Sequence, residues 1–427
     1  MVVDDPMGQT FAEKILAKKA GRERTAPGQI VRIIPDRTFS VDNTARIIRI
    51  FKSMGAGKIF DPAHAIILDH NAPPSQTQHA ESHLAIRTFV AEQQLENFYD
   101  VGRGICHQVL LEEGLALPGE VLLGADSHTP HAGAFGVFSA GIGHTEMASL
   151  WALGHLWLRV PESMKIVVHG VLPRGVTAKD LALHVIGDLK ADAGLYMSVE
   201  WHGGAVRALT IDQRTVLTNM MTEMGVKNSY IPPDQRVFDY LRGRAKRPYE
   251  PVYPDDDAAY ARVVEYDASS MVPMVACPHA VDNVVPLAEV IGRKIDQAFI
   301  GTCANGRLED LAAAAMILEG RRISPRTRMI IIPASSEIYL DALKAGYIET
   351  FVKAGAMVES PGCGPCLGGH MGIPAAGETV ASSSNRNFQG RMGTNGSEIY
   401  LASPEVVAAA GVAGMFAEPG TIGDYGA

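Results

Sequence analysis

Cysteine is scarce in this chain of 427 residues, which contains only five, at positions 106, 277, 303, 363 and 366. So small and odd a set does not suit a disulfide framework, because such frameworks usually pair an even number of cysteines. We therefore expect a reducing compartment, the cytoplasm. In that compartment a Cys-x-x-Cys motif more often binds a metal or undergoes redox chemistry.

The sequence also lacks a long basic run, an apolar stretch of membrane-spanning length and a readable secretory signal. Its formal net charge is −9, whereas proteins that bind nucleic acid or membrane surfaces usually carry a basic patch. A membrane span needs about 18 or more apolar residues, and the N-terminal Met-Val-Val-Asp-Asp-Pro has no apolar signal core. These absences argue against nucleic-acid and membrane partners.

What the sequence does contain is a recurring order of short apolar run, polar loop and helical stretch. The apolar runs at 65–68, 120–123, 298–300, 329–332 and 356–358 each lead into such a loop. This alternation predicts an α/β architecture with mostly parallel sheets. Since ligands bind beyond the carboxyl ends of strands in such sheets, the loops are the expected site.

The length of the chain suits two or three domains. We expect three αβα domains, at 1–162, 163–293 and 294–427, with a short amphipathic helix at 10–19. The stretch 231–257 is rich in Pro, Asp and Tyr and is predicted to be a long surface loop.

Three of the cysteines stand in glycine- and proline-rich motifs. Cys303 lies in Gly-Thr-Cys-Ala-Asn-Gly-Arg, and Cys363 and Cys366 lie in Pro-Gly-Cys-Gly-Pro-Cys. Structural zinc sites and all-cysteine iron–sulfur clusters usually have four ligands, so three thiolates predict a metal with one open position. Zinc and iron–sulfur both fit, and buried thiols or a redox pair are the alternatives. His370 fits an outer residue better than a fourth ligand.

Two carboxylate–imidazole pairs follow predicted strands, Asp69-His70 and Asp126-Ser127-His128. A carboxylate can orient a histidine and raise its basicity, which suits general acid–base chemistry. Chance dipeptides and helix caps are the alternative explanation for each pair alone. A serine-hydrolase role for Ser127 is disfavoured, because no Gly-x-Ser-x-Gly motif surrounds it.

Three further groups are weaker candidates on their residues alone. His107 follows a glycine pair, and Asn219 and Glu223 share a face of a predicted helix at 216–225. The segment 382–391 carries Arg386 and Arg391 among serines and asparagines, a composition that suits carboxylate or phosphate binding. A structural histidine, a solvated or capping pair and a polar surface loop are the respective alternatives.

Together and in this order, these motifs resemble the aconitase superfamily, in the compact large-subunit form that 3-isopropylmalate dehydratase, homoaconitase and 2,3-dimethylmalate dehydratase share. The similarity begins at Met7-Gly8-Gln9-Thr10, so Met1 and Met7 are both candidate starts, and it continues to 385–391. Its most specific parts are the cysteine motifs, Asp-Ser-His-Thr-Pro and Asn-Arg-Asn-Phe-x-Gly-Arg. The sequence departs from the family pattern at 40–44, where we assign no residue, and at Ala304, where threonine is commoner.

The resemblance implies a [4Fe–4S] cluster held by Cys303, Cys363 and Cys366, whose fourth iron binds the substrate and acts as a Lewis acid. It implies that His70, oriented by Asp69, helps to protonate the leaving hydroxyl. The full implied catalytic set is Asp69, His70, His107, Asp126, Ser127, His128 and Glu223. The implied substrate-binding set is Asn219, Asn385, Arg386 and Arg391.

The implied reaction is that of a hydro-lyase, which dehydrates a 2-hydroxy di- or tricarboxylate and rehydrates the alkene at the neighbouring carbon. The expected substrate is 3-isopropylmalate, in leucine biosynthesis, with homoaconitate, citramalate and 2,3-dimethylmalate as alternatives. Single-chain relatives carry a fourth, swivelling domain with a serine base, which we expect here on a separate small subunit that also reads the substrate's side chain. A zinc hydrolase and an RNA-binding cluster sensor are the rival classes, and the acidic charge disfavours the sensor.

Overall fold

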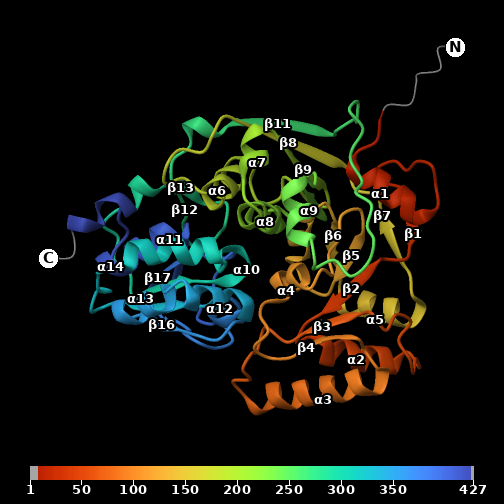
Figure 1. The fold of residues 1–427 in the computed structure, drawn as a ribbon, viewed down its shortest axis with the longest axis horizontal. Helices are drawn as coiled ribbons and strands as arrows, with labels where there is room; N and C mark the ends of the chain where they lie inside the picture. The colour runs from red at the N-terminus through yellow and green to blue at the C-terminus, as the bar shows by residue number, and fades with distance from the viewer. Residues whose placement is uncertain (1–7, 425–427) are drawn as a thin grey trace.

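The computed structural model describes residues 8–424 (Figure 1), so the candidate start at Met7 lies outside the described residues. Its strands form three sheets, in which most neighbouring strands are parallel, and one two-stranded antiparallel ribbon. The α/β class with mostly parallel sheets, predicted from the alternation of apolar runs and helices, is therefore confirmed. Among the described residues, no helix has both the length and the apolar character that crossing a membrane requires.

The first sheet is parallel throughout, with the strand order β4-β3-β2-β5-β6. Every residue of its strands β3 and β5 is buried, as expected where helices cover both faces of a parallel sheet. The elements of this region are α1 (Phe11–Ala20), β1 (Ile30–Ile33), β2 (Arg37–Ser40), α2 (Thr44–Ser53), β3 (Ala65–Ile67), α3 (Thr77–Gln93), β4 (Asn97–Tyr99), α4 (Cys106–Glu112), β5 (Val121–Gly124), η1 (Thr129–Phe135), β6 (Phe138–Gly141), α5 (His144–Leu153) and β7 (Leu156–Arg159), with β1 and β7 forming the ribbon.

The second sheet is also parallel and has the order β10-β9-β8-β11. Its elements are β8 (Ser163–His169), α6 (Ala178–Leu189), β9 (Ser198–His202), α7 (Gly204–Ala208), α8 (Ile211–Met220), η2 (Met221–Met224), β10 (Asn228–Tyr230), α9 (Gln235–Leu241), β11 (Arg262–Asp267) and η3 (Ala268–Ser270). The predicted surface loop at 231–257 is wrong in part, because it contains α9. The side chain of Asp234 accepts from the Arg236 N–H and begins this helix.

The third sheet has seven strands in the order β13-β12-β18-β17-β14-β15-β16, in which β12 is antiparallel to both of its neighbours and all other neighbouring strands are parallel. Its elements are β12 (Met274–Ala276), β13 (Val284–Pro286), η4 (Leu287–Glu289), β14 (Gln297–Ile300), α10 (Thr302–Asn305), α11 (Leu308–Leu318), β15 (Arg328–Ile331), α12 (Ser336–Lys344), α13 (Tyr347–Ala354), β16 (Met357–Val358), η5 (Gly364–Leu367), β17 (Thr379–Ser382), β18 (Glu398–Leu401), α14 (Pro404–Ala413) and η6 (Pro419–Asp424). Division of the chain at 162 and 293 remains a prediction, and β12 and β13 precede the second boundary although they belong to this sheet.

The layers of the first and third sheets meet where the residues before α4 contact the turn between β15 and α12, and α4 and α10 are labelled near this place in Figure 1. The backbone N–H of Ile105 donates to the carbonyl of Ala334 at 2.8 Å, and Gly104 forms an isolated antiparallel bridge with Ser335. Gly104 has φ +137°, and a Cβ there would lie 2.6 Å from the Cα of Ser335. Only glycine permits this approach, which brings the strand ends of the two sheets together.

Candidate active site

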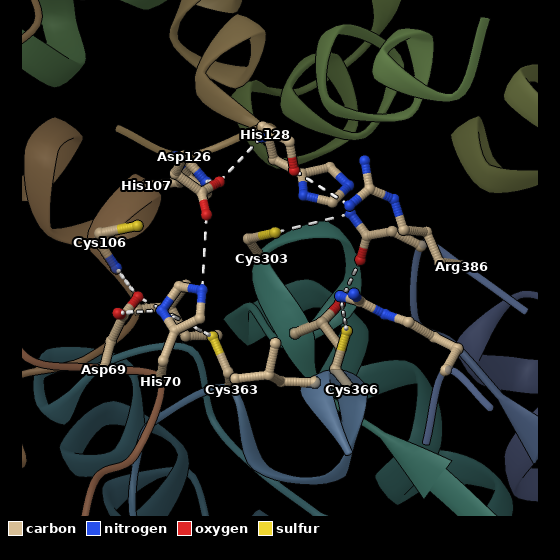
Figure 2. Close-up of a pocket in the computed structure, with 16 residues that line it drawn as sticks. Asp69, His70, Cys106, His107, Asp126, His128, Cys303, Cys363, Cys366 and Arg386 are labelled. Atoms are coloured by element: carbon tan, nitrogen blue, oxygen red, sulfur yellow. Dashed lines mark hydrogen bonds and ion pairs between the residues drawn. The ribbon is translucent and has the colours of Figure 1, made fainter. Parts of the chain in front are cut away.

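Five strands deliver predicted site residues to one pocket. Asp69-His70 follows β3, Asp126–His128 follows β5, Cys303 follows β14, the Cys363–Cys366 loop follows β16, and Asn385, Arg386 and Arg391 follow β17. Figure 2 shows these side chains converging on a cavity of about 110 Å³. The cavity is lined by Asp69, His70, His107, Asp126, Ser127, His128, Cys303, Cys363, Cys366, Asn385, Arg386 and Arg391, together with Ile105, Cys106, Thr302 and Leu367.

Asn219 and Glu223 stand behind the lining and contact it. Asn219, on α8, donates from Nδ2 to the Cys303 sulfur at 3.2 Å, and Glu223, on η2, accepts from Arg386. Asn219 is fully buried and Glu223 is 7% exposed, so the alternative of an ordinary solvated pair is wrong.

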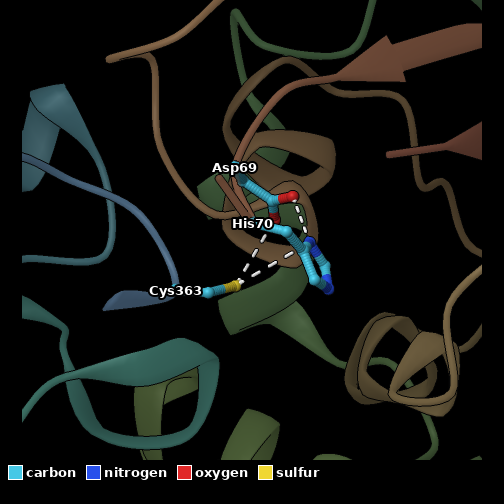
Figure 3. Close-up of side chains that lie close together, drawn as sticks. All are labelled: Asp69, His70 and Cys363. Atoms are coloured by element: carbon cyan, nitrogen blue, oxygen red, sulfur yellow. Dashed lines mark hydrogen bonds and ion pairs between the residues drawn. The ribbon is translucent and has the colours of Figure 1, made fainter. Parts of the chain in front are cut away.

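The spacing of the cysteines bears on how many metal atoms they can hold. Among residues 8–424, the only three possible ligand atoms found within 4.8 Å of one another belong to Asp69, His70 and Cys363 (Figure 3). The sulfurs of Cys303, Cys363 and Cys366 are not such a group, so at least two of them lie farther apart. A single zinc ion at about 2.3 Å from each sulfur would require sulfur separations of about 4 Å. The spacing therefore suits several metal atoms better than one.

The compact group of Asp69, His70 and Cys363 is a poor alternative for a single ion. The Cys363 sulfur lies 3.9 Å from Asp69 Oδ2 and 4.0 Å from His70 Nδ1. However, His70 Nδ1 already lies 2.6 Å from Asp69 Oδ1. A metal bound there through Nδ1 would have to replace this hydrogen bond.

The surroundings of the sulfurs fit an iron–sulfur cluster. Burial raises the pKa of the Cys303 thiol to about 12 and also raises the pKa of Cys363, so a bound metal is what would keep these sulfurs deprotonated. Asn385 Nδ2 lies 3.6 Å from the Cys303 sulfur, and Arg391 Nη2 lies 3.8 Å from the Cys366 sulfur. Such N–H donors to sulfur are typical of cluster sites.

The backbone around the cysteines has unusual conformations. Thr302 has φ +78°, and a β-branched residue in this region costs on the order of 1–3 kcal/mol. Its hydroxyl donates to Asn385 Oδ1 at 3.1 Å and accepts from the Ala304 N–H at 3.2 Å. Gly364, between the paired cysteines, has φ +54°, and a Cβ there would lie 2.3 Å from Ile332 Cδ1. Both cysteine loops are thus held tightly against their neighbours.

His70 lies between two carboxylates. Its Nδ1 is 2.6 Å from Asp69 Oδ1, and its Nε2 is 3.4 Å from Asp126 Oδ2. Burial disfavours its charged form, but Cys363, Asp69 and Asp126 outweigh burial and hold the pKa of His70 well above its usual value. This histidine can therefore carry a proton toward the pocket at Nε2.

Asp126 is in turn shared with His107, whose Nε2 lies 2.8 Å from Asp126 Oδ1. Burial raises the pKa of Asp126, but hydrogen bonds with His107 and His70 hold it well below the usual range. Asp126 is therefore an ionised acceptor that orients two imidazoles at once.

On the other wall, Glu223 fixes His128 and Arg386. Its Oε1 lies 2.9 Å from His128 Nε2, and Arg386 Nε donates to both carboxylate oxygens, at 2.8 and 3.0 Å. Burial and then Arg386 lower the pKa of His128 to about 4, so this imidazole is neutral near pH 7. Arg386 Nη1 also donates to Ser127 Oγ at 3.0 Å, which leaves its guanidinium aimed along the pocket.

Sequence reasoning missed several residues that hold the site. Asp42 accepts from the backbone N–H groups of Asp69 at 3.0 Å and His70 at 2.8 Å, and also bonds His83 Nε2 at 2.7 Å. It lies in 40–44, where no residue was assigned, and no local motif marks it because its partners lie far away in the sequence.

Two other missed residues are aromatic or sulfur-bearing neighbours of the predicted set. The backbone N–H of Cys106 donates to Asp69 Oδ2 at 2.7 Å. His131 packs on His107, with ring centroids 5.5 Å apart, and its Nδ1 lies 3.1 Å from Asn219 Nδ2. His370 instead has its Nε2 3.2 Å from the backbone oxygen of His70, as an outer residue would.

Comparison with known proteins gives consistent matches over most of the chain. Residues 13–294 and 288–414 match the Aconitase family (aconitate hydratase). A relative from Methanopyrus kandleri, named 3-isopropylmalate dehydratase large subunit 1, is 47% identical over 97% of this chain and 99% of its own length. A relative from Methanosarcina mazei, named probable methanogen homoaconitase large subunit, is 48% identical over 90% of this chain and 98% of its own length.

Proposed function

Because the chain belongs to the aconitase family of hydro-lyases, we propose that it is the catalytic large subunit of a [4Fe–4S] hydro-lyase acting on a 2-hydroxy di- or tricarboxylate. The observation that carries this proposal is the pocket itself. In that pocket, three cysteine sulfurs that do not all lie within 4.8 Å of one another face a histidine held between two carboxylates and a guanidinium held by Glu223.

Cys303, Cys363 and Cys366 would hold the cluster, with Asn219, Asn385 and Arg391 donating toward their sulfurs. When bound, a cluster with one iron free of thiolate supplies a Lewis acid that weakens the C–O bond of a substrate hydroxyl.

The protonating group would be His70. Its Nδ1 is fixed by Asp69, so its Nε2 is directed toward Asp126 and the cavity. A protonated imidazole there can give its proton to a departing hydroxyl, and ionised Asp126 can stabilise the imidazolium before the transfer. His107, bonded to the other oxygen of Asp126, keeps that carboxylate in place.

The substrate's carboxylates would be bound by Arg386 and Arg391, with Asn385 and Ser127 as neighbouring polar groups. A guanidinium can hold a carboxylate through two parallel hydrogen bonds. Arg386 is oriented through its Nε by Glu223 and keeps its Nη atoms toward Ser127 and the cavity. Neutral His128 adds a polar contact without adding charge.

Both relatives described above are named large subunits, which supports a small subunit as partner for this chain. We propose that this partner brings the serine base and the loop that reads the substrate's side chain. We propose 3-isopropylmalate as the substrate, in leucine biosynthesis, with homoaconitate, citramalate and 2,3-dimethylmalate as alternatives. The few unpaired cysteines are consistent with a reducing compartment such as the cytoplasm.

The test is anaerobic reconstitution of the chain with iron and sulfide, followed by assay with and without a small subunit encoded beside it. We expect about four irons and four sulfides per chain, low activity alone, and activity on 3-isopropylmalate when the small subunit is added. Bound zinc without sulfide would support a zinc hydrolase instead. Full activity of the isolated chain would contradict the two-subunit assignment, and preference for another acid would correct the substrate.

A further inference from the structure

A lysine is buried beside the cysteine loops. Lys179 lies in the first turn of α6 and is fully buried. A buried ammonium is costly, and the N-terminal end of a helix disfavours a cation because its free N–H groups already carry partial positive charge. Within residues 8–424, no carboxylate oxygen lies within 4.0 Å of its Nζ, as an ion pair would require. Something other than a simple ion pair must therefore hold it there.

Two of the three hydrogen bonds of the Lys179 ammonium lead to the segment that carries Asn385. Its Nζ donates to the backbone carbonyl of Ser384 at 2.6 Å and to that of Ser383 at 3.1 Å. Its third contact is the Met220 sulfur at 3.6 Å. Lys179 thus joins a helix of the second sheet's layer to a loop that follows β17 of the third sheet.

The segment of these two serines contacts the turn that carries Cys303. The Ser383 hydroxyl accepts from the Gly301 N–H at 3.1 Å, and Gly301 precedes the Thr302–Cys303 turn. The residue after Ser384 is Asn385, which bonds Thr302 and approaches the Cys303 sulfur at 3.6 Å. The ammonium therefore holds a segment that in turn contacts the turn carrying Cys303, a predicted cluster ligand.

The ammonium of Lys179 also lies near the Cys303 sulfur, because it bonds the carbonyl of Ser384 and the next residue, Asn385, places its Nδ2 3.6 Å from that sulfur. Burial lowers the pKa of Lys179 to about 8, while Cys366, Asp310 and Cys303 oppose this and raise it. Asp180 raises it as well, so two carboxylates share with the cysteines in keeping this buried amine charged. Asp310 is itself engaged by Asn305 at 3.0 Å and by the Arg307 N–H at 3.0 Å.

We propose that Lys179 is a positioning residue that supplies buried positive charge to the cysteine-bound cluster and holds the Ser383–Asn385 segment against the Cys303 turn. This inference rests on the proposed function, because it assumes that a cluster is bound. Positive charge near a cluster favours the more negative, reduced form and so raises its reduction potential.

Three substitutions separate charge from hydrogen bonding. K179M removes both, K179Q keeps a donor for the serine carbonyls without charge, and K179R keeps both. K227M is the matched control, since Lys227 is a partly buried lysine whose Nζ donates to the Gly141 carbonyl, away from the serine segment. Each reconstituted protein is assayed with its small subunit and titrated for the midpoint potential of its cluster.

We expect K179M and K179Q to shift the potential to more negative values, with K179R and K227M close to the unsubstituted protein. The KM for substrate should rise about tenfold in K179M, the loss expected for one charge-assisted hydrogen bond, and less in K179Q. A merely structural role for Lys179 would not move the potential of a cluster that still forms.

Unchanged potentials in both neutral variants would overturn the proposal, as would an equal shift in K179R and K179M. If the neutral variants fail to fold even without iron while K179R folds, the charge of Lys179 is needed for folding of the chain and not for the cluster. That result would also overturn the proposal. Failure of the unsubstituted protein to take up a cluster is a different result, which would overturn the proposed function.

Discussion

The carboxylate of Asp69 holds two parts of the site at once: Oδ1 lies 2.6 Å from Nδ1 of His70, and Oδ2 accepts the backbone N–H of Cys106, where α4 begins, at 2.7 Å. The imidazole is thus oriented by the same group that anchors a helix N-terminus. This double use makes Asp69 sensitive to even an isosteric change.

Replacing Asp69 with Asn should lower kcat by about 100-fold or more, because the imidazolium loses its anionic partner and its orientation. Absorbance of the alkene intermediate gives the rate, and iron content shows whether the site still loads. The matched control is Asp100→Asn, whose carboxylate pairs with Arg87 near the surface. If D69N and D100N had the same kcat, the proposed role of the His70–Asp69 pair in protonating the leaving hydroxyl would be contradicted.

Replacing Cys303, Cys363 or Cys366 with Ala should abolish iron and sulfide binding. The Cys106→Ala variant should retain both, although Cys106 lines the same pocket, and Cys277→Ala provides a second control. Metal analysis and visible absorbance are the measurements. A complete cluster in C363A would show that the ligand set is wrong.

Arg386→Lys should raise the KM for substrate by about 10- to 100-fold with little loss of protein stability. Lysine keeps the charge but cannot bond Glu223 through one nitrogen while offering two others to a carboxylate. Steady-state kinetics and thermal unfolding are compared with Arg242→Lys, an exposed arginine paired with Asp239. Equal KM values for the two variants would contradict a substrate-binding role.

Asp42→Asn should reduce the free energy of unfolding by about 2–4 kcal/mol at pH 7. Burial raises the pKa of Asp42, but His83, His70 and the backbone N–H groups of the Asp69–Asn71 loop lower it far below its usual value. The folded pKa is depressed, so this stabilisation is present above the unfolded pKa of about 4 and is lost as the pH falls through the folded value.

The groups that face Asp42 are His83, His70 and His370, so the test compares unfolding of unsubstituted and D42N protein from pH 7 down to pH 3. The gap between their free energies of unfolding should narrow below about pH 4. A gap that widens on acidification would show that the carboxylate is not held in its charged form.

Exposure to air should inactivate the reconstituted enzyme, because an iron without a thiolate ligand is readily lost. Anaerobic ferrous iron and thiol should restore most of the activity. Activity and iron content are followed together, with anaerobic incubation as the control. An enzyme that loses no activity in air would count against an open iron position.

The sequence predicted most of the fold class and of the pocket because both depend on local signals. Apolar runs such as 298–300 predict buried parallel strands. The polar residues directly after such strands lie together at one edge of the sheet. The expected 10–19 helix is observed as α1, whose capping box of Thr10 and Glu13 is a local feature. The helix expected at 216–225 is wrong in part, because α8 ends at Met220 and a 3-10 helix follows.

Residues that act through distant partners could not be predicted in this way. Asp42 reaches the backbone of His70, and Lys179 reaches carbonyls more than 200 positions away. The short helix α9 was hidden by its Pro- and Asp-rich flanks. The positive φ of Thr302 has no signal in sequence, since threonine disfavours that conformation and only its surroundings impose it.

The contact between Gly104 and Ser335 places the candidate active site at the junction of two sheets. The proton-handling residues Asp69, His70 and Asp126 belong to one sheet, and the three cysteines belong to the other. A side chain added at Gly104 would clash with Ser335, separate the two sheets at this junction and move the proposed acid away from the proposed metal centre. Metal loading and turnover can therefore be uncoupled by a residue that takes part in neither.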